Sequence, residues 1–91
     1  MDFWAPWCAP CRIVSPVVER IATSMAGRIK LAKVNTDTAQ NLASRFGIRG
    51  IPTLVLLDHG NELARVTGAL GEPALRKWVE ENIATRSASR N

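Results

Sequence analysis

The chain contains two cysteines, Cys8 and Cys11, and two residues separate them. In a helix this spacing places both side chains on one face, at positions i and i+3. One helical turn meets the Cα separation of about 4.4–6.8 Å that a disulfide requires. Because such a bridge closes a very short loop, it adds little to stability. The spacing therefore predicts a dithiol whose use is chemical.

The residues after Cys8 predict a helix that begins at this dithiol. Pro10 suits the first turn, where no backbone N–H is needed. Apolar residues recur at helical spacing over residues 14–25, and Gly27 ends the run. Unpaired N–H groups and the helix dipole favour a thiolate at such an N-terminus. We therefore predict that Cys8 attacks a substrate disulfide and that Cys11, one turn further in and more shielded, resolves the mixed disulfide.

The rest of the chain predicts the strands that hold this dithiol in place. Strands are predicted over residues 1–5, 29–35, 53–58 and 62–67. The first two flank the helix, so they form a right-handed parallel crossover in which the second strand is covered on both faces. The last two flank His59-Gly60-Asn61 and form an antiparallel hairpin. His59 is expected to be a tip residue without a catalytic part.

The helices have recognisable starts and ends. They are predicted over residues 11–25, 38–46 and 73–84. Pro16 lies inside the first and should kink it. The second has Thr36 or Asp37 as its candidate N-cap and Gly47 as its stop. Residues 1–84 then form one domain, and the polar residues 85–91 are predicted to be a disordered tail.

Composition excludes several classes of protein. The 91 residues suffice for one hydrophobic core, and the net charge of +4 is spread along the chain without interleaved aromatics, which argues against a nucleic-acid surface. No run approaches the roughly 18 apolar residues of a membrane span, and the first residues lack a signal-peptide pattern. A single C-x-x-C pair suits a reducing compartment, so we expect a cytoplasmic protein.

Five segments together carry a family resemblance. They are Asp2-Phe3-Trp4-Ala5-Pro6-Trp7-Cys8-Ala9-Pro10-Cys11-Arg12, Pro16, Lys33-Val34-Asn35, Phe46-Gly47-Ile48-Arg49-Gly50-Ile51-Pro52-Thr53 and Gly68-Ala69. This combination resembles the thioredoxin family, closest to the bacterial thioredoxin-2 type, as far as about residue 83. The resemblance implies a thioredoxin-like α/β fold with a four-stranded mixed sheet and three helices.

The resemblance also implies a sheet order in which strand 29–35 forms one edge, followed by the strands at 1–5, 53–58 and 62–67. Family members carry a further strand, a helix and the start of the central strand before the Asp-Phe-Trp segment, and this sequence lacks them. Without them the edge at strand 29–35 has no partner. An unpaired edge invites pairing with another chain, so we expect either a homodimer or reduced stability.

The remaining site residues follow from the same resemblance. Asp2 would be a buried carboxylate beneath the dithiol, with Lys33 as its partner, and burial would raise its pKa so that it accepts the proton of Cys11. A cis peptide between Ile51 and Pro52 would pack against the dithiol.

The substrate surface is expected to surround that peptide. It would pair with an extended substrate segment by strand addition and would consist of Trp7, Ala9, Pro10, Ile51, Pro52, Gly68 and Ala69. Trp7 should be exposed, and Gly68 should let a partner backbone approach closely. Ala9 stands where the family usually carries Gly, which should shift the redox poise or the fit of the substrate.

Three functions remain open from the sequence. The first is a thioredoxin that reduces protein disulfides and is recharged by a flavin-dependent thioredoxin reductase using NADPH, a step that the resemblance alone implies. The second is a disulfide donor or isomerase with a shifted potential. The third is a redox-silent interaction module that self-associates. No cofactor is expected in the chain, and a zinc site would lack ligands, since His59 is the one other soft ligand.

Overall fold

A computed structural model describes residues 1–89, with side chains for residues 1–84. Within these residues one four-stranded sheet has the order β2-β1-β3-β4. Its strands are β1 (Asp2–Trp4), β2 (Lys33–Asn35), β3 (Thr53–Asp58) and β4 (Asn61–Thr67), and its helices are α1 (Ala9–Ser24), α2 (Gln40–Arg45) and α3 (Glu72–Ser89). The predicted fold class and sheet order are therefore confirmed.

The sheet is mixed because β1 pairs differently on its two sides. Phe3 lies opposite Val34 of the parallel strand β2 and opposite Thr53 of the antiparallel strand β3. Strands β3 and β4 form the predicted hairpin, whose two-residue turn has positive φ at His59 (52°) and Gly60 (83°). Two positive φ values match the twist that a tight hairpin requires.

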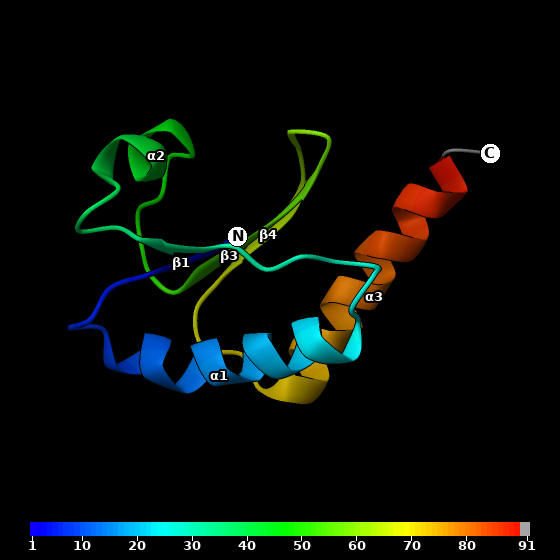
Figure 1. The fold of residues 1–91 in the computed structure, drawn as a ribbon, viewed down its shortest axis with the longest axis horizontal. Helices are drawn as coiled ribbons and strands as arrows, with labels where there is room; N and C mark the ends of the chain where they lie inside the picture. The colour runs from blue at the N-terminus through cyan, green and yellow to red at the C-terminus, as the bar shows by residue number, and fades with distance from the viewer. Residues whose placement is uncertain (90–91) are drawn as a thin grey trace.

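Helices cover both faces of the sheet, with α1 and α3 together on one face and α2 on the other (Figure 1). Successive residues of β3 divide between the two sides, because side chains alternate along a strand. Leu54 packs with Val14 and Leu75, whereas Val55 packs with Phe3 on the side of α2. The start of α1 and the loop before β3 lie at the same end of the sheet, where Ile51 packs against the two cysteines.

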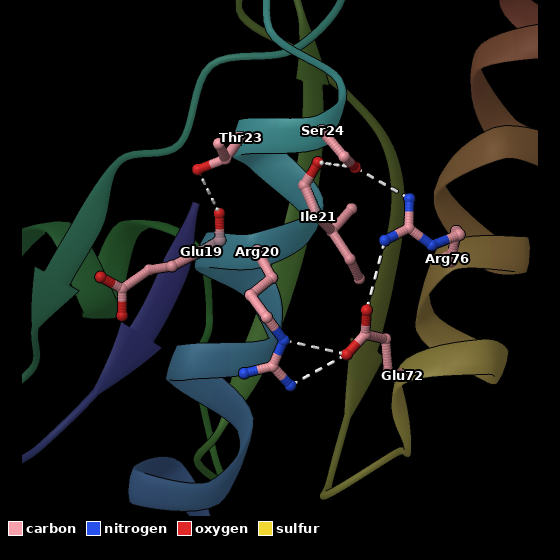
Figure 2. Close-up of polar contacts among 7 residues, drawn as sticks. All are labelled: Glu19, Arg20, Ile21, Thr23, Ser24, Glu72 and Arg76. Carbon is pink, nitrogen blue, oxygen red and sulfur yellow. Dashed lines mark hydrogen bonds and ion pairs between the residues drawn. The ribbon is translucent and has the colours of Figure 1, made fainter.

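A polar cluster joins α1 to α3 on the surface (Figure 2). The guanidinium of Arg20 donates two hydrogen bonds to Oε1 of Glu72, at 3.1 and 2.9 Å. Arg76 donates to the other carboxylate oxygen, Oε2, at 3.2 Å and to the hydroxyl of Ser24 at 2.8 Å. Glu72 begins α3, so its carboxylate also lies at the favourable end of the helix dipole.

The strand predicted over residues 29–35 is shorter than expected, since β2 starts at Lys33. The cause is that no strand in the part of the chain that the structure describes pairs with residues 29–31. Asp2 lies opposite Lys33 and its N–H donates to the carbonyl of Ala32, so residues 29–31 extend past the first residue of β1. The expected burial of this run is also wrong, because among residues 29–35 only Val34 is buried.

Neither predicted N-cap of the second helix is correct. Helix α2 begins after Ala39, which makes no side-chain cap hydrogen bond. Thr36 and Asp37 are engaged elsewhere: the Thr36 hydroxyl donates to the carbonyl of Trp4, and Asp37 accepts from the indole of Trp7. The stop at Gly47 is confirmed, because the helix ends with Phe46 as its C-cap.

The third helix continues to Ser89, so its predicted end at residue 84 is five residues too short. Ala and Arg favour helix, and residues 85–89 contain no Gly or Pro to stop one. The last two residues of the tail predicted to be disordered, 90 and 91, lie outside the described residues. The division of the chain at residue 84 stays a prediction.

Candidate active site

The two cysteines form a disulfide at the N-terminus of α1. Their Cα atoms are 5.3 Å apart, within the range that a bridge requires. Cys8 is the N-cap of the helix, and the backbone N–H of Cys11 donates to its Sγ at 3.2 Å. Both side chains are buried, with 3% and 1% of their surface exposed, so the expected difference in shielding is small in the oxidised form.

The loop before β3 lies against the first cysteine. The carbonyl oxygen of Ile51 is 3.8 Å from Sγ of Cys8, and the peptide between Ile51 and Pro52 is cis. Pro52 is buried, whereas Ile51 is half-buried and packs with Ala5 and the two cysteines. The predicted contact between this loop and the dithiol is therefore present.

The loop after β4 closes the other side of Pro52. The N–H of Gly68 donates to the carbonyl of Pro52 at 2.9 Å, and Gly68 has a φ of 109°, which favours glycine. Ala69 follows and is exposed. Three segments far apart in sequence, around residues 8, 52 and 68, thus meet at one end of the sheet.

Trp7 stands at the rim of this region with 67% of its surface exposed, as predicted. Its indole Nε1–H donates to Oδ1 of Asp37 at 3.1 Å, and this hydrogen bond holds the indole ring in one orientation. Thr36, Ile48 and Ile51 join Trp7 in lining a shallow surface hollow. Ala9 and Pro10, in the first turn of α1, are also exposed.

Asp2 is fully buried. The hydroxyl of Ser15 donates to its Oδ2 at 2.9 Å. Burial is the main influence on the carboxyl and raises its pKa, while the Ser15 hydrogen bond and the charge of Lys33 lower that pKa. The predicted burial and the direction of the pKa shift are both present.

Lys33 acts on Asp2 through its charge, and its direct contacts lie elsewhere. Its Nζ is 3.7 Å from Oε2 of Glu19 and 5.4 Å from the centroid of the Trp4 ring. The hydrogen-bond partner of Asp2 is Ser15, a residue that we did not identify from the sequence. A signal for it was present, because Ser15 is a polar residue four positions after Cys11, on the otherwise apolar buried face of the helix.

Two negative findings concern the described part of the chain. Among those residues, no three His, Cys, Asp or Glu side chains gather where a metal ion could be held. Likewise, no helix in that part is both long and apolar enough to cross a membrane.

This arrangement defines a class of protein. A disulfide at a helix N-terminus, a proline loop against it and a buried carboxyl group on β1, hydrogen-bonded to the same helix, are the parts of a thiol–disulfide oxidoreductase. Comparison with known proteins makes the family specific: the family model described as Thioredoxin matches residues 1–81.

Curated relatives and a solved structure agree with the match. Over 83 residues, covering 91% of this chain and 78% of each relative, the chain is 47% identical to "Thioredoxin 1" of Nostoc sp. (strain PCC 7120) and 41% identical to "Thioredoxin" of Haemophilus influenzae. The structure of a mutant thioredoxin from Halobacterium salinarum superposes with a TM-score of 0.80 at 41% identity, covering 90% of this chain and 71% of that one.

The chain therefore belongs to the thioredoxin family and is a protein-disulfide oxidoreductase. The two alternatives from the sequence, a disulfide donor or isomerase and a redox-silent interaction module, are not favoured. The cysteine pair is intact and positioned as a redox-active C-x-x-C motif.

Proposed function

We propose that this chain reduces disulfides of protein substrates, with Cys8 as the attacking thiol and Cys11 as the resolving thiol. The observation that supports these roles is the position of the pair. Cys8 is the N-cap, where helix N–H groups stabilise a thiolate, and Cys11 lies one turn further along the same face.

The reaction takes two steps. The Cys8 thiolate attacks one sulfur of the substrate disulfide, and the other substrate sulfur leaves as a thiolate. Cys11 then attacks Sγ of Cys8, which releases the second substrate thiol and forms the Cys8–Cys11 disulfide. Two electrons pass from the dithiol to the substrate, and the product is the oxidised form that the structure contains.

The substrate chain docks on the surface around the Ile51–Pro52 peptide. An extended segment adds as a strand to the backbone beside Ile51, while Trp7 and the loop of Gly68 and Ala69 flank it. Ala9 and Pro10, exposed in the first turn of α1 after Cys8, belong to the same docking surface. Exposed apolar area next to the sulfurs favours unfolded or extended protein segments over small-molecule disulfides.

Asp2 serves the resolving step. A buried carboxyl with a raised pKa is a suitable acceptor for the proton that Cys11 must lose before it attacks. Lys33 supports this role from β2, because its positive charge keeps the carboxylate form accessible.

The partners and compartment follow from the chemistry. A reductase that accumulates as a disulfide needs a reductant, and we propose a thioredoxin reductase that delivers electrons from NADPH through a flavin, with no cofactor bound by this chain. Such a cycle suits a reducing compartment such as the cytoplasm. We further propose that the free edge of β2 allows a homodimer, since within the described residues this strand pairs on one side only.

Reduction of insulin, followed by turbidity with dithiothreitol as electron donor, tests the function. The chain should accelerate precipitation, and a Cys8→Ser, Cys11→Ser double variant should not. A folded wild-type chain that gives no acceleration would contradict the proposal. Size-exclusion chromatography over a range of concentrations tests the homodimer separately, and a monomer throughout would contradict that part alone.

A further inference from the structure

Ser15 makes a contact that is unusual for a hydroxyl inside a helix. Ser and Thr in helices commonly bond back to a carbonyl of the preceding turn. Thr23 and Ser24 of α1 do so, donating to the carbonyls of Glu19 and Ile21. Ser15, with 8% of its surface exposed, instead donates across to β1, to Oδ2 of Asp2.

The two oxygens of the Asp2 carboxyl therefore differ. Oδ2 accepts from Ser15, whereas Oδ1 is buried and has no hydrogen-bond partner among the described residues. A buried acceptor without a partner costs free energy, so its persistence calls for a functional reason. An ionised carboxylate has acceptor sites only, so Oδ1 is the oxygen open to a proton.

Helix geometry places this contact under the resolving cysteine. Ser15 follows Cys11 by four residues, so the two lie one turn apart on the same face of α1, and both are buried. A hollow beside α1 has Cys11, Ser15, Glu19 and Lys33 among its lining residues. Ser15 thus connects the buried carboxyl with a solvent-accessible hollow.

Three charged groups act on Asp2, whereas its neighbour on β3 is the apolar Leu54. Lys33 on β2 and the terminal ammonium of Met1 favour the carboxylate, and Glu19 on α1 opposes it. The Ser15 hydrogen bond is the largest of the influences that lower the pKa of Asp2, ahead of either positive charge. Removal of that bond should therefore be visible in the titration of Asp2.

We propose that Ser15 is a positioning residue for the resolving step, which holds Oδ2 of Asp2 and leaves Oδ1 to receive the proton of Cys11. The inference rests on the function proposed above. The proton of the Cys11 thiol moves to Oδ1 while its sulfur attacks Sγ of Cys8. The Cys8–Cys11 bond forms, the bond from Cys8 to the substrate sulfur breaks, and that sulfur leaves with the electron pair as a thiolate.

Two measurements on Ser15→Ala test the proposal. The first is the titration of the Asp2 carboxyl in the oxidised protein by ¹³C NMR, which needs no turnover. Because a hydrogen bond to the charged form is lost, the pKa of Asp2 should rise by about one unit. The second is the pH profile of the resolving step, read as release of the second thionitrobenzoate when the reduced protein reacts with dithiobis(nitrobenzoate). The midpoint of this pH profile should move to higher pH by the same amount.

Matched variants separate positioning from packing. Ser15→Thr keeps a hydroxyl and should restore the Asp2 pKa and the pH profile of the wild type. Ser15→Val has nearly the same size as Thr but no hydroxyl, and should behave like Ser15→Ala. This pair also decides the question if Ser15→Ala does not fold. Ser24→Ala removes a serine hydroxyl from the same helix, away from Asp2, and should leave both the titration and the profile unchanged.

An unchanged Asp2 pKa in Ser15→Ala would overturn the proposal, and so would a shifted pKa with an unchanged pH profile. Equal behaviour of the Thr and Val variants would overturn it as well. A wild-type chain that fails to reduce insulin is a different outcome, which overturns the proposed function. The two failures are distinguishable because the carboxyl titration is independent of catalysis.

Discussion

The backbone N–H of Cys11 donates to Sγ of Cys8 at 3.2 Å, which makes the attacking sulfur the cap of the helix that carries the resolving sulfur. The same N–H that stabilises a Cys8 thiolate thus belongs to the residue that later displaces the substrate. This relationship links the two chemical steps to one turn of α1 and leads to the first prediction.

In the reduced protein Cys8 should react with iodoacetamide faster than Cys11, by roughly tenfold at neutral pH, because it occupies the N-cap. Mass spectrometry after short exposure should find the label on Cys8 first. The same experiment in concentrated urea supplies the control, since the two thiols should then react at similar rates. Preferential labelling of Cys11 in the folded protein would assign the roles the other way round.

Replacement of Trp7 by Ala should weaken binding of protein substrates while the fold keeps its stability. The side chain is 67% exposed, and substitutions at such surface positions usually change the free energy of unfolding by no more than about 0.5 kcal/mol. We expect KM for insulin to rise several-fold. Reduction of a small disulfide should change less.

Leu63→Ala is a suitable control for this substitution. Leu63 is an exposed apolar residue of β4, 39% exposed, near the hairpin turn and away from the end of the strand that meets Pro52. Its removal should leave KM unchanged. Equal effects of the two substitutions would show that Trp7 contributes only generic apolar surface.

Asp2→Asn should stabilise the oxidised protein at neutral pH. The folded-state pKa of Asp2 is raised, so the folded protein holds this proton more strongly than the unfolded chain. The stability that this bound proton contributes is fully present below the ordinary pKa of 3.8 and is lost as the pH rises through the raised pKa. A difference of one pKa unit between the folded and unfolded states corresponds to about 1.4 kcal/mol.

Urea denaturation of both proteins across this pH range measures the effect. The difference in unfolding free energy between Asp2→Asn and the wild type should grow with rising pH and then level off. The Met1 ammonium, whose pKa is lowered, also makes stability depend on pH, and Asp2→Asn removes the charge that raises the pKa of this group, so the comparison is made below the pH range in which the ammonium loses its proton. A difference that does not change with pH would mean that the Asp2 pKa is not raised.

Glu72→Gln should loosen the contact between α1 and α3. Arg20 and Arg76 both donate to this carboxylate and hold its pKa below the ordinary value of 4.5. The stabilisation is therefore present above that value and is lost as the pH falls through the lowered one. We expect a small decrease in Tm at neutral pH that shrinks with added salt, because the cluster is exposed.

Glu80→Gln provides the matched control, since Glu80 is an exposed carboxylate of the same helix. Thermal unfolding followed by circular dichroism compares the two. A Tm change of the same size in both variants would show that the cluster in Figure 2 adds nothing beyond general charge effects.

The dithiol, the helix that follows it, the hairpin and the order of strands could all be predicted from the amino-acid sequence. The dithiol, the helix and the hairpin depend on local signals: the two-residue spacing of Cys8 and Cys11, the proline at the start of α1, and the turn at His59 and Gly60. Neighbouring residues establish them, so a linear pattern is sufficient to predict them. The order of strands came from the family resemblance.

The lengths of the elements and the pairing of polar groups emerged only in the folded molecule. Strand β2 is short because, among residues 1–89, no strand lies opposite residues 29–31, and α2 begins after Ala39 while Asp37 is occupied by Trp7. Asp2 meets Ser15 only when β1 packs under α1, and burial then raises the pKa of Asp2. These outcomes depend on which distant groups come together and on the removal of water, neither of which is contained in the spacing of residues along the chain.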